Sequence, residues 1–140
     1  MAASQRHVGR QRAVQALFAL EEATPEAIDR GLQDFWASVE EKTSPQARAF
    51  AEELVRGVIA HRAELDAAVQ AESQNWRLER MARVDRNVLR VAAWELLHTG
   101  TPARVVINEA VEVARTFGGE NSPAFVNGIL DRLARTHGRL

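Results

Sequence analysis

Arginine is the residue type with which this chain can do the most chemistry. Of its 18 basic residues only Lys42 is a lysine, and a guanidinium group suits bidentate contacts with phosphate and stacking on aromatic rings. Three arginines, Arg6, Arg10 and Arg12, lie in the first 20 residues, where there is no acidic residue. This segment, the amino-terminal arm, is predicted to meet a polyanion such as RNA. An arginine-rich proteome or an organellar targeting segment would also give this composition.

The helical wheel separates the three arginines of the arm. With about 100° per residue, Arg6 and Arg12 project away from the apolar side of the first predicted helix. Arg10 falls on that apolar side, where it can pair internally. Arg6 and Arg12 are therefore the better candidates for contacts outside the chain.

A second group of arginines lies on one side of the predicted helix 79–98. Arg83, Arg86 and Arg90 gather opposite its apolar side, together with Trp94. Such a stripe can meet phosphates and stack on a base. Alternatively, Arg90 and Trp94 form an exposed structural cation–π pair. We prefer the structural interpretation, and both stay open from the sequence.

Phe125 is the aromatic residue best placed to meet a nucleic acid. It lies in the first turn of the predicted helix 123–136, at the edge of the side that carries Val126, Ile129 and Leu133. A half-exposed ring there can stack on an unpaired base while helix N–H groups approach phosphate. The alternative is that the ring completes the core. The first interpretation requires the ring and the arm to lie side by side.

Groups that support catalysis are missing from the sequence. There is no cysteine, which excludes disulfides, thiolate catalysis and cysteine-based metal centres. There is also no HExxH, GxGxxG, GxxxxGK[ST] or GxSxG motif. The four histidines, His7, His61, His98 and His137, lie in distant segments. We therefore predict a protein that is not an enzyme, with no catalytic residue, metal or cofactor.

Charge and hydropathy restrict the partners and the compartment. Residues 1–20 have a net charge of +3, residues 21–72 have 12 acids against 5 bases for −7, and residues 73–140 have +3. The near-neutral total argues against strong nonspecific binding of long duplexes, but it allows a local basic site. No apolar run approaches the ~20 residues that cross a bilayer. We predict a cytoplasmic protein with no membrane partner.

Prolines, glycines and apolar spacing predict helices throughout. Each of the four prolines follows a hydroxyl residue, in the order of an N-cap and a first helical residue. Gly100 and the pair Gly118-Gly119 stand where helices should stop, which suits a left-handed closing residue. No stretch alternates like a strand. The predicted helices lie near 8–22, 26–41, 46–71 with a break allowed near His61, 79–98, 102–117 and 123–136.

These helices are predicted to form a single all-α domain over residues 1–140, a compact bundle of about six to seven helices. A chain of this size has room for one core. The longest link, around residues 71–78, separates N-terminal helices at about 8–71 from C-terminal helices at about 79–136. We expect two packed helical layers around a shared core. Gly57 and Gly128, both inside predicted helices, indicate close helix approaches.

Long stretches of the chain closely resemble the NusB transcription antitermination family. They are INEAVEVARTFGGENSPAFVNGILDRL over Ile107–Leu133, RVDRNVLRVAAWEL before it, RQRAVQALF over Arg10–Phe18, and LVRGVIAHRAELDAAV with the later Asn75-Trp76. The resemblance implies an all-helical protein that binds a boxA element in single-stranded nascent RNA together with the ribosomal protein NusE. It implies a role in ribosomal RNA transcription, within the RNA polymerase antitermination complex.

The resemblance also implies which residues act. The implied RNA-binding positions are Arg6, His7, Arg10, Arg12, Asn121 and Phe125, and the implied NusE-facing positions are Phe18 and Asp85. The family often has tyrosine where this chain has Phe18, so no hydroxyl is available there. His7 and Val8 interrupt the basic residues of the arm, which predicts weak RNA binding by the chain alone.

Two alternatives from other classes remain. An NusB-like domain also forms the RNA-binding front of certain ribosomal RNA cytosine methyltransferases, so the chain could be related to such an enzyme. It has no cysteine and no Rossmann-like segment with which to transfer a methyl group itself. The other alternative is a protein-only helical adaptor, or a homodimer that buries its RNA face.

Overall fold

The computed structural model describes residues 2–140, and these residues form an all-α fold, as predicted. Two short 3₁₀ turns, η1 (Pro25–Ala27) and η2 (Leu78–Arg80), interrupt the helical sequence. The α-helices in the described part are α1 (Ala2–Ala19), α2 (Ile28–Ser38), α3 (Pro45–Ala60), α4 (Arg62–Glu72), α5 (Arg83–His98), α6 (Ala103–Phe117) and α7 (Ser122–Thr136).

The break near His61 is confirmed, and it separates α3 from α4. His61 leaves the helical region, with φ −118° and ψ 21°. Its imidazole Nδ1 lies 2.9 Å from the carbonyl oxygen of Gly57, one turn earlier. A side chain that bonds to the preceding turn offers the backbone an alternative to continued helix.

The predicted caps were right in only one case. Ser44 accepts a hydrogen bond from the backbone N–H of Ala47 at 3.1 Å, whereas Thr24 makes no such bond at the start of η1. Helix α6 begins after Pro102, so Thr101 lies outside the N-cap position. Ser122 is already inside α7, and its hydroxyl accepts from the N–H of Gly119, which closes the preceding turn.

The prediction of left-handed glycines at the helix ends was wrong. Among the described residues only Gly138 has a positive φ, and Gly118 is extended, with φ −93° and ψ −171°. The need for glycine at position 118 comes instead from the lack of room for a side chain. A Cβ there would lie 2.5 Å from the hydroxyl oxygen of Ser122 and 2.7 Å from the carbonyl oxygen of Ala114.

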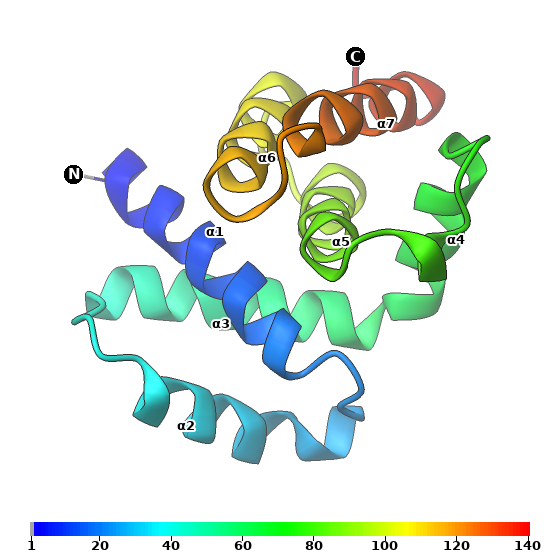
Figure 1. The fold of residues 1–140 in the computed structure, drawn as a ribbon. Helices are drawn as coiled ribbons and strands as arrows, with labels where there is room; N and C mark the ends of the chain where they lie inside the picture. The colour runs from blue at the N-terminus through cyan, green and yellow to red at the C-terminus, as the bar shows by residue number, and fades with distance from the viewer. Residues whose placement is uncertain (1) are drawn as a thin grey trace.

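Helix α5 is at the centre of the arrangement. It packs against α1, α3, α4, α6 and α7, while α1 crosses α3 and α6 lies beside α7 (Figure 1). Helix α2 lies at the periphery, below α3 in the same view. The two layers therefore meet along α5, which places side chains from both ends of the chain near one another.

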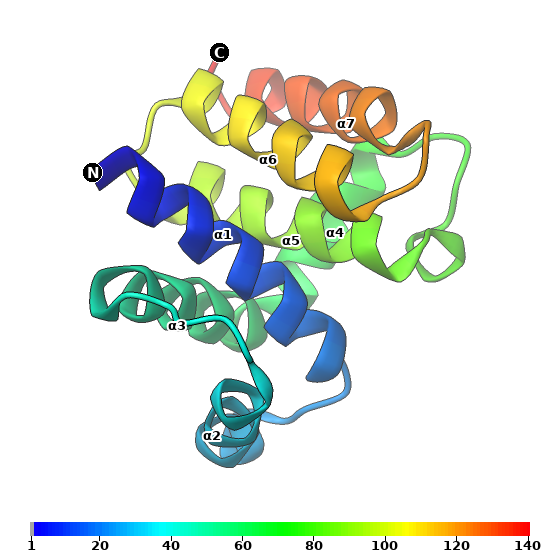
Figure 2. The ribbon, with the colours of Figure 1, turned by 60° about the vertical axis from the view of Figure 1, so that its left-hand side comes forward.

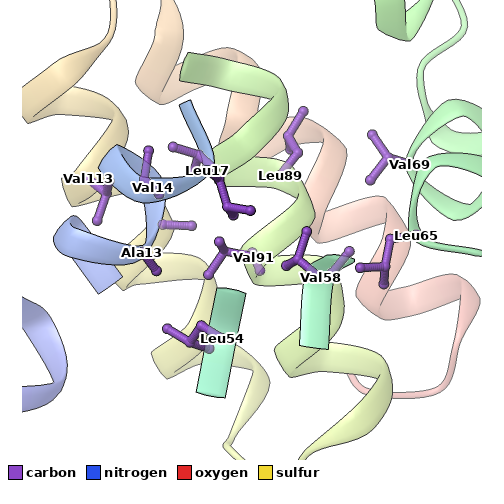
Figure 3. Close-up of a cluster of buried hydrophobic side chains, with 14 of the residues drawn as sticks. Ala13, Val14, Leu17, Leu54, Val58, Leu65, Val69, Leu89, Val91 and Val113 are labelled. Carbon is purple, nitrogen blue, oxygen red and sulfur yellow. The ribbon is translucent and has the colours of Figure 1, made fainter. Parts of the chain in front are cut away.

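The shared core draws residues from both layers. Figure 3 shows Leu17 of α1, Leu54 and Val58 of α3, Leu65 of α4 and Leu89 of α5 in one buried cluster. Burying an aliphatic side chain of this size stabilises a fold by about 1.5–3 kcal/mol. This cluster holds the helices that position the polar groups described below.

The predicted close helix approach is confirmed at Gly57 but not at Gly128, where a Cβ would meet only the Arg132 side chain, at an ordinary 3.6 Å. A Cβ at Gly57 would overlap the indole ring of Trp94, so α3 and α5 can only pack this closely with glycine there. Trp94 is consequently half-buried against α3.

Candidate nucleic-acid interface

Arg6 and Arg12 lie on the outer side of α1, as their wheel positions predict. Arg6 is exposed, and its guanidinium lies 4.5 Å from the centre of the Phe50 ring of α3. Arg12 is more constrained: its side chain is 13% exposed, donates to the Thr43 hydroxyl at 3.1 Å and the Gln15 side-chain oxygen at 3.0 Å, and lies 3.5 Å from the carboxylate of the exposed Glu41. Arg6 is therefore the more accessible cation of the two.

Arg10 lies inside the protein, so we withdraw it as an RNA contact. Its side chain is only 4% exposed, and it makes two hydrogen bonds of 2.8 Å to the carboxylate of Glu95 in α5. The guanidinium also lies beside the Phe50 ring, at 5.2 Å from its centre. Because the guanidinium is buried and held by the Glu95 carboxylate, phosphate in solvent cannot reach it. This outcome agrees with the internal pairing that its wheel position allowed.

His7 faces α6 rather than solvent alone. Its Nδ1 lies 2.8 Å from a carboxylate oxygen of Glu109, and its Nε2 lies 3.3 Å from the amide nitrogen of Gln11. The half-buried imidazole therefore links α1 to the first half of α6. An RNA strand that binds here must share His7 with Glu109.

The arginine stripe of α5 turns out to be an internal ion-pair network. Arg83, Arg86 and Arg90 all reach the carboxylate of Glu21, which follows α1 and is 7% exposed. Burial alone would raise the pKa of Glu21. Hydrogen bonds from the three arginines outweigh burial and lower this pKa to about 2. The stripe therefore stabilises the fold and offers little free charge to phosphates.

The predicted Arg90–Trp94 pair is not present in the described part of the chain. Arg90 donates to both carboxylate oxygens of Asp66 in α4, at 2.7 and 3.0 Å, which directs the guanidinium away from the indole. Trp94 packs on Gly57 instead, and its indole N–H is buried without a hydrogen-bond partner. The structural interpretation of the stripe was right, but its partners are acids from other helices.

Phe125 lies at the rim of two adjoining hollows at the start of α7. The larger, of about 500 Å³, is also lined by Asp85, Asn121 and Trp76. The smaller, of about 270 Å³, is lined by the same two aromatic residues together with Arg132. We call the two together the aromatic hollow. The larger volume falls within the ~300–1,000 Å³ of small-molecule sites.

The Phe125 ring is half-buried and packs against the core while still lining the hollow. Asn121 is exposed, and its carbonyl oxygen accepts the N–H of Phe125 at 3.1 Å. The turn before them is tight, since the Gly119 N–H bonds to the Ser122 hydroxyl at 3.0 Å. The start of α7 therefore presents the ring and the amide on a rigid turn.

The arm and the aromatic hollow do not lie side by side, which corrects the predicted arrangement. Figure 2 shows the start of α1 beside the first half of α6, and α7 beginning beyond the opposite end of α6. The His7–Glu109 contact fixes the first of these positions. The site residues expected from the sequence therefore form two separate groups.

The second group also contains the residues implied to face a protein partner. Asp85 lines the aromatic hollow together with Asn121 and Phe125. Phe18, at the end of α1, is 43% exposed, and its ring lies 4.2 Å below the guanidinium of Arg83. The same guanidinium donates to the carbonyl oxygen of Phe18 at 2.7 Å. Helix α5 thus begins between Phe18 and the hollow.

Comparison with known proteins connects these features to a family. The NusB family model matches residues 7–135. The chain belongs to the NusB family. It is 52% identical, over 94% of its length and 91% of the other protein, to the transcription antitermination protein NusB of Anaeromyxobacter dehalogenans strain 2CP-1. It is 51% identical, over 92% and 94%, to the same-named protein of Myxococcus xanthus.

Solved structures agree with this family assignment. NusB of T. maritima, 36% identical, superposes with a TM-score of 0.78 over 93% of this chain and 90% of that chain. A complex of the antitermination factors NusB and NusE with double-stranded RNA contains a chain with a TM-score of 0.73 and 23% identity. That chain is covered to 98%, against 95% of this one, and the likeness shows a shared fold.

The sequence pattern did not single out two residues that shape these surfaces. Trp76 appeared only as part of a family string, yet its side chain is 55% exposed at the hollow. A tryptophan in a polar link between helices, with no helix face to bury it, was the available signal. Glu21, which organises three arginines, gave no local signal because its partners are more than 60 residues away.

The described residues bring few potential metal ligands together. No group of three acids or histidines there could hold a metal ion. His61 and His98, far apart in sequence, do meet, with ring centres 4.4 Å apart. None of the described helices is long and apolar enough to cross a bilayer.

Proposed function

We propose that this chain is a cytoplasmic transcription antitermination factor that acts by binding and not by catalysis. It binds boxA-type single-stranded RNA in nascent transcripts jointly with the ribosomal protein NusE, within the RNA polymerase antitermination complex, and so supports ribosomal RNA transcription. The observation that carries the proposal is the half-exposed Phe125 ring in a hollow at a helix start. Membership of the NusB family supports the same function.

The proposed RNA contacts divide into charge and base recognition. Arg6, Arg12 and His7 supply the charged or polar contacts to phosphate and sugar, while Asn121 and Phe125 meet unpaired bases. Phosphate contacts position a nucleic acid, whereas contacts to bases give specificity. The two groups lie near opposite ends of α6, so a single RNA strand must run along this helix to contact both.

The arm alone binds RNA weakly in this proposal. With Arg10 buried, two arginines remain, and two phosphate contacts on a single strand give a salt slope of only about −1.4. NusE must therefore add surface. Two linked proteins that both touch the RNA raise avidity by ~10²–10⁴ through effective concentration.

For the NusE-facing surface we propose Phe18 as the main contact. Its ring is the more available of the two implied positions, since the Asp85 carboxylate lines the hollow. The guanidinium of Arg83 over the ring orients Phe18 from one side and leaves the other side to a partner. Asp85 then takes part at the edge of this surface.

A titration with a boxA oligonucleotide, with and without NusE and at two salt concentrations, tests the proposal. We expect weak binding by the chain alone, much tighter binding with NusE, and a shallow salt dependence. The double charge reversal Arg6→Glu with Arg12→Glu should weaken binding with little change in thermal stability. The matched control is Arg30→Glu on α2, whose side chain is 84% exposed and contacts neither group of site residues in the described structure.

Two outcomes would contradict the proposal. Equal affinity for boxA with and without NusE would remove the joint recognition. An unchanged titration after charge reversal in the arm would favour the protein-only adaptor or the homodimer. Both relatives reported above are transcription antitermination proteins, which favours an antitermination factor over a methyltransferase domain.

A further inference from the structure

We propose that Glu109 of α6 limits the RNA affinity of the amino-terminal arm. Its carboxylate holds His7 and places a fixed negative charge beside the arm, so an RNA strand gains little from the arm unless a second contact also holds the strand. The inference rests on the proposed function, because it concerns the same RNA-binding arm. It adds a residue that acts against phosphate and sets how strongly the arm binds.

Both ring nitrogens of His7 already have partners. Nδ1 lies 2.8 Å from a carboxylate oxygen of Glu109, and Nε2 lies 3.3 Å from the side-chain nitrogen of Gln11. In a neutral imidazole one nitrogen donates and the other accepts. The two partners fit this form, because Nδ1–H can donate to the carboxylate while Nε2 accepts from the amide. His7 therefore has no free nitrogen for RNA until one of these contacts breaks.

The Glu109 carboxylate is held in place from two sides. Its second oxygen lies 3.9 Å from Nη1 of Arg10, whose guanidinium is itself bound to Glu95 in the interior. The side chain of Glu109 is 23% exposed, against 56% for Glu112 on the next turn of α6. Attraction to Arg10 and contact with His7 thus fix this negative charge where the start of α1 meets the first half of α6 (Figure 2).

The arm has little net charge to offer to a phosphate. Arg10 is neutralised by its buried carboxylate partner, and Arg12 lies 3.5 Å from the carboxylate of the exposed Glu41. Arg6 is the exposed cation, and Glu109 opposes it with a negative charge in contact with the next residue along α1. A unit charge about 4–8 Å from a phosphate changes affinity roughly two- to sixfold in water. Glu109 therefore cancels much of the attraction that Arg6 exerts on RNA.

The consequence is an arm that retains RNA only when another contact holds the strand. Phosphate contacts carry no sequence information, so the unfavourable effect of Glu109 applies to every RNA alike. Base contacts at the start of α7 and the surface added by NusE offset this effect for RNA that reaches them. An unrelated transcript that touches the arm alone dissociates.

The test compares Glu109→Gln with the wild type in RNA titrations. The ligands are a boxA oligonucleotide and an unrelated single-stranded RNA of the same length, each with and without NusE. Glutamine is close to glutamate in shape, and its carbonyl oxygen can still accept from Nδ1–H of His7. We expect the variant without NusE to bind both RNAs roughly three- to tenfold more tightly than the wild type does.

Salt dependence separates an electrostatic role from a structural one. Removing the carboxylate is equivalent to adding up to one net phosphate contact. The slope of log affinity against log salt concentration should therefore steepen by up to about 0.7. A substitution that only loosened the contact between α1 and α6 would lower the thermal midpoint and leave this slope unchanged.

The matched control is Asp34→Asn, which also removes one negative charge. Asp34 lies on α2, where its side chain is 70% exposed and its carboxylate lies 3.8 Å from Arg30. It contacts neither group of site residues in the described structure. We expect its RNA affinity to stay within about twofold of the wild-type value, because salt screens exposed charges on separate surfaces.

Four results would overturn the inference: no gain in affinity in a natively folded Glu109→Gln, a gain for only one of the two RNAs, a gain without a steeper salt slope, or an equal gain in Asp34→Asn. The proposed function fails separately, when the wild type with NusE shows no preference for boxA. That failure together with tighter binding by Glu109→Gln would refute the function and keep the role of Glu109. Joint binding of boxA without any gain in Glu109→Gln would do the reverse.

Discussion

The arginines of the arm and the arginines of α5 have the same side chain and opposite surroundings. On α5, Arg86 and Arg90 point at acids that α4 and the end of α1 bring to them, Asp66 and Glu21. On α1, Arg6 meets the face of an aromatic ring and no acid within the described residues. The difference lies in what the opposing helix carries. An arginine becomes structural when another element supplies a buried carboxylate, as Glu21 and Glu95 do, and it stays available when none does.

Arg10 sharpens this comparison because it belongs to the arm by sequence and to the interior by contacts. Replacing it with methionine keeps the apolar stem and leaves Glu95 charged, buried and unpaired. Removing one partner of a buried ion pair costs about 3–5 kcal/mol. We expect Arg10→Met to lower the free energy of unfolding by this amount in urea denaturation. A loss below about 1 kcal/mol would place Arg10 with the exposed arginines.

The next effect concerns the acid that the α5 arginines share. Glu21→Gln leaves three guanidinium groups around a neutral amide, and we expect a loss of about 3 kcal/mol in the free energy of unfolding. Glu22→Gln is the matched control, because the neighbouring Glu22 is exposed. Equal stability of the two variants would show that the network contributes nothing.

Acid should weaken the α5 network selectively. The pKa of Glu21 falls from 4.5 to about 2 in the folded protein, because hydrogen bonds from the arginines outweigh burial. A lowered folded pKa stabilises the protein above the unfolded pKa, and this contribution is lost as pH falls from about 4.5 to about 2. The loss is at most about 3 kcal/mol. Urea midpoints across this range should fall more steeply in the wild type than in Glu21→Gln.

The smallest effect on stability is expected at Arg6. Arg6→Gln removes an exposed cation over Phe50, and such a change costs about 0.5–1 kcal/mol or less. Its effect should instead appear in RNA binding, as a salt slope that is shallower by about 0.7. A thermal melt measures the change in stability, and a salt titration of RNA binding on the same sample measures the change in slope. A large loss of stability without a change in slope would move Arg6 into the structural group.

Much of the fold could be predicted from local sequence patterns. Apolar spacing and the Ser/Thr-Pro pairs located the helices, the break near His61 and the close contact at Gly57. Capping was predicted less well, because a hydroxyl before proline bonds to whichever N–H the turn presents, as Ser122 does with Gly119. The local sequence determines that a helix starts near each such pair. The geometry of the preceding turn determines which groups form hydrogen bonds with the first backbone N–H groups of the helix.

The candidate site was only partly predictable, because it depends on contacts far apart in sequence. Helical-wheel positions correctly separated the buried Arg10 from the exposed Arg6, since the direction in which each side chain leaves α1 depends only on its position in that helix. The ion pair of Arg83 with Glu21 spans 62 residues, and Trp76, in the link after α4, lines the same hollow as Phe125 of α7. Neither could follow from periodicity. The expected adjacency of the arm and Phe125 was wrong for the same reason, because α6 separates them.

If RNA contacts both groups as proposed, the position of α6 between the arm and the aromatic hollow sets a minimum length for the bound RNA. Its 15 residues span about 22 Å. An RNA oligonucleotide shorter than this helix can bind at one end of it but not at both. A longer oligonucleotide that is bound at one end can also bind at the other end without a second bimolecular step. Affinity plotted against oligonucleotide length should therefore rise in a step. The length of α6 would determine where that step falls.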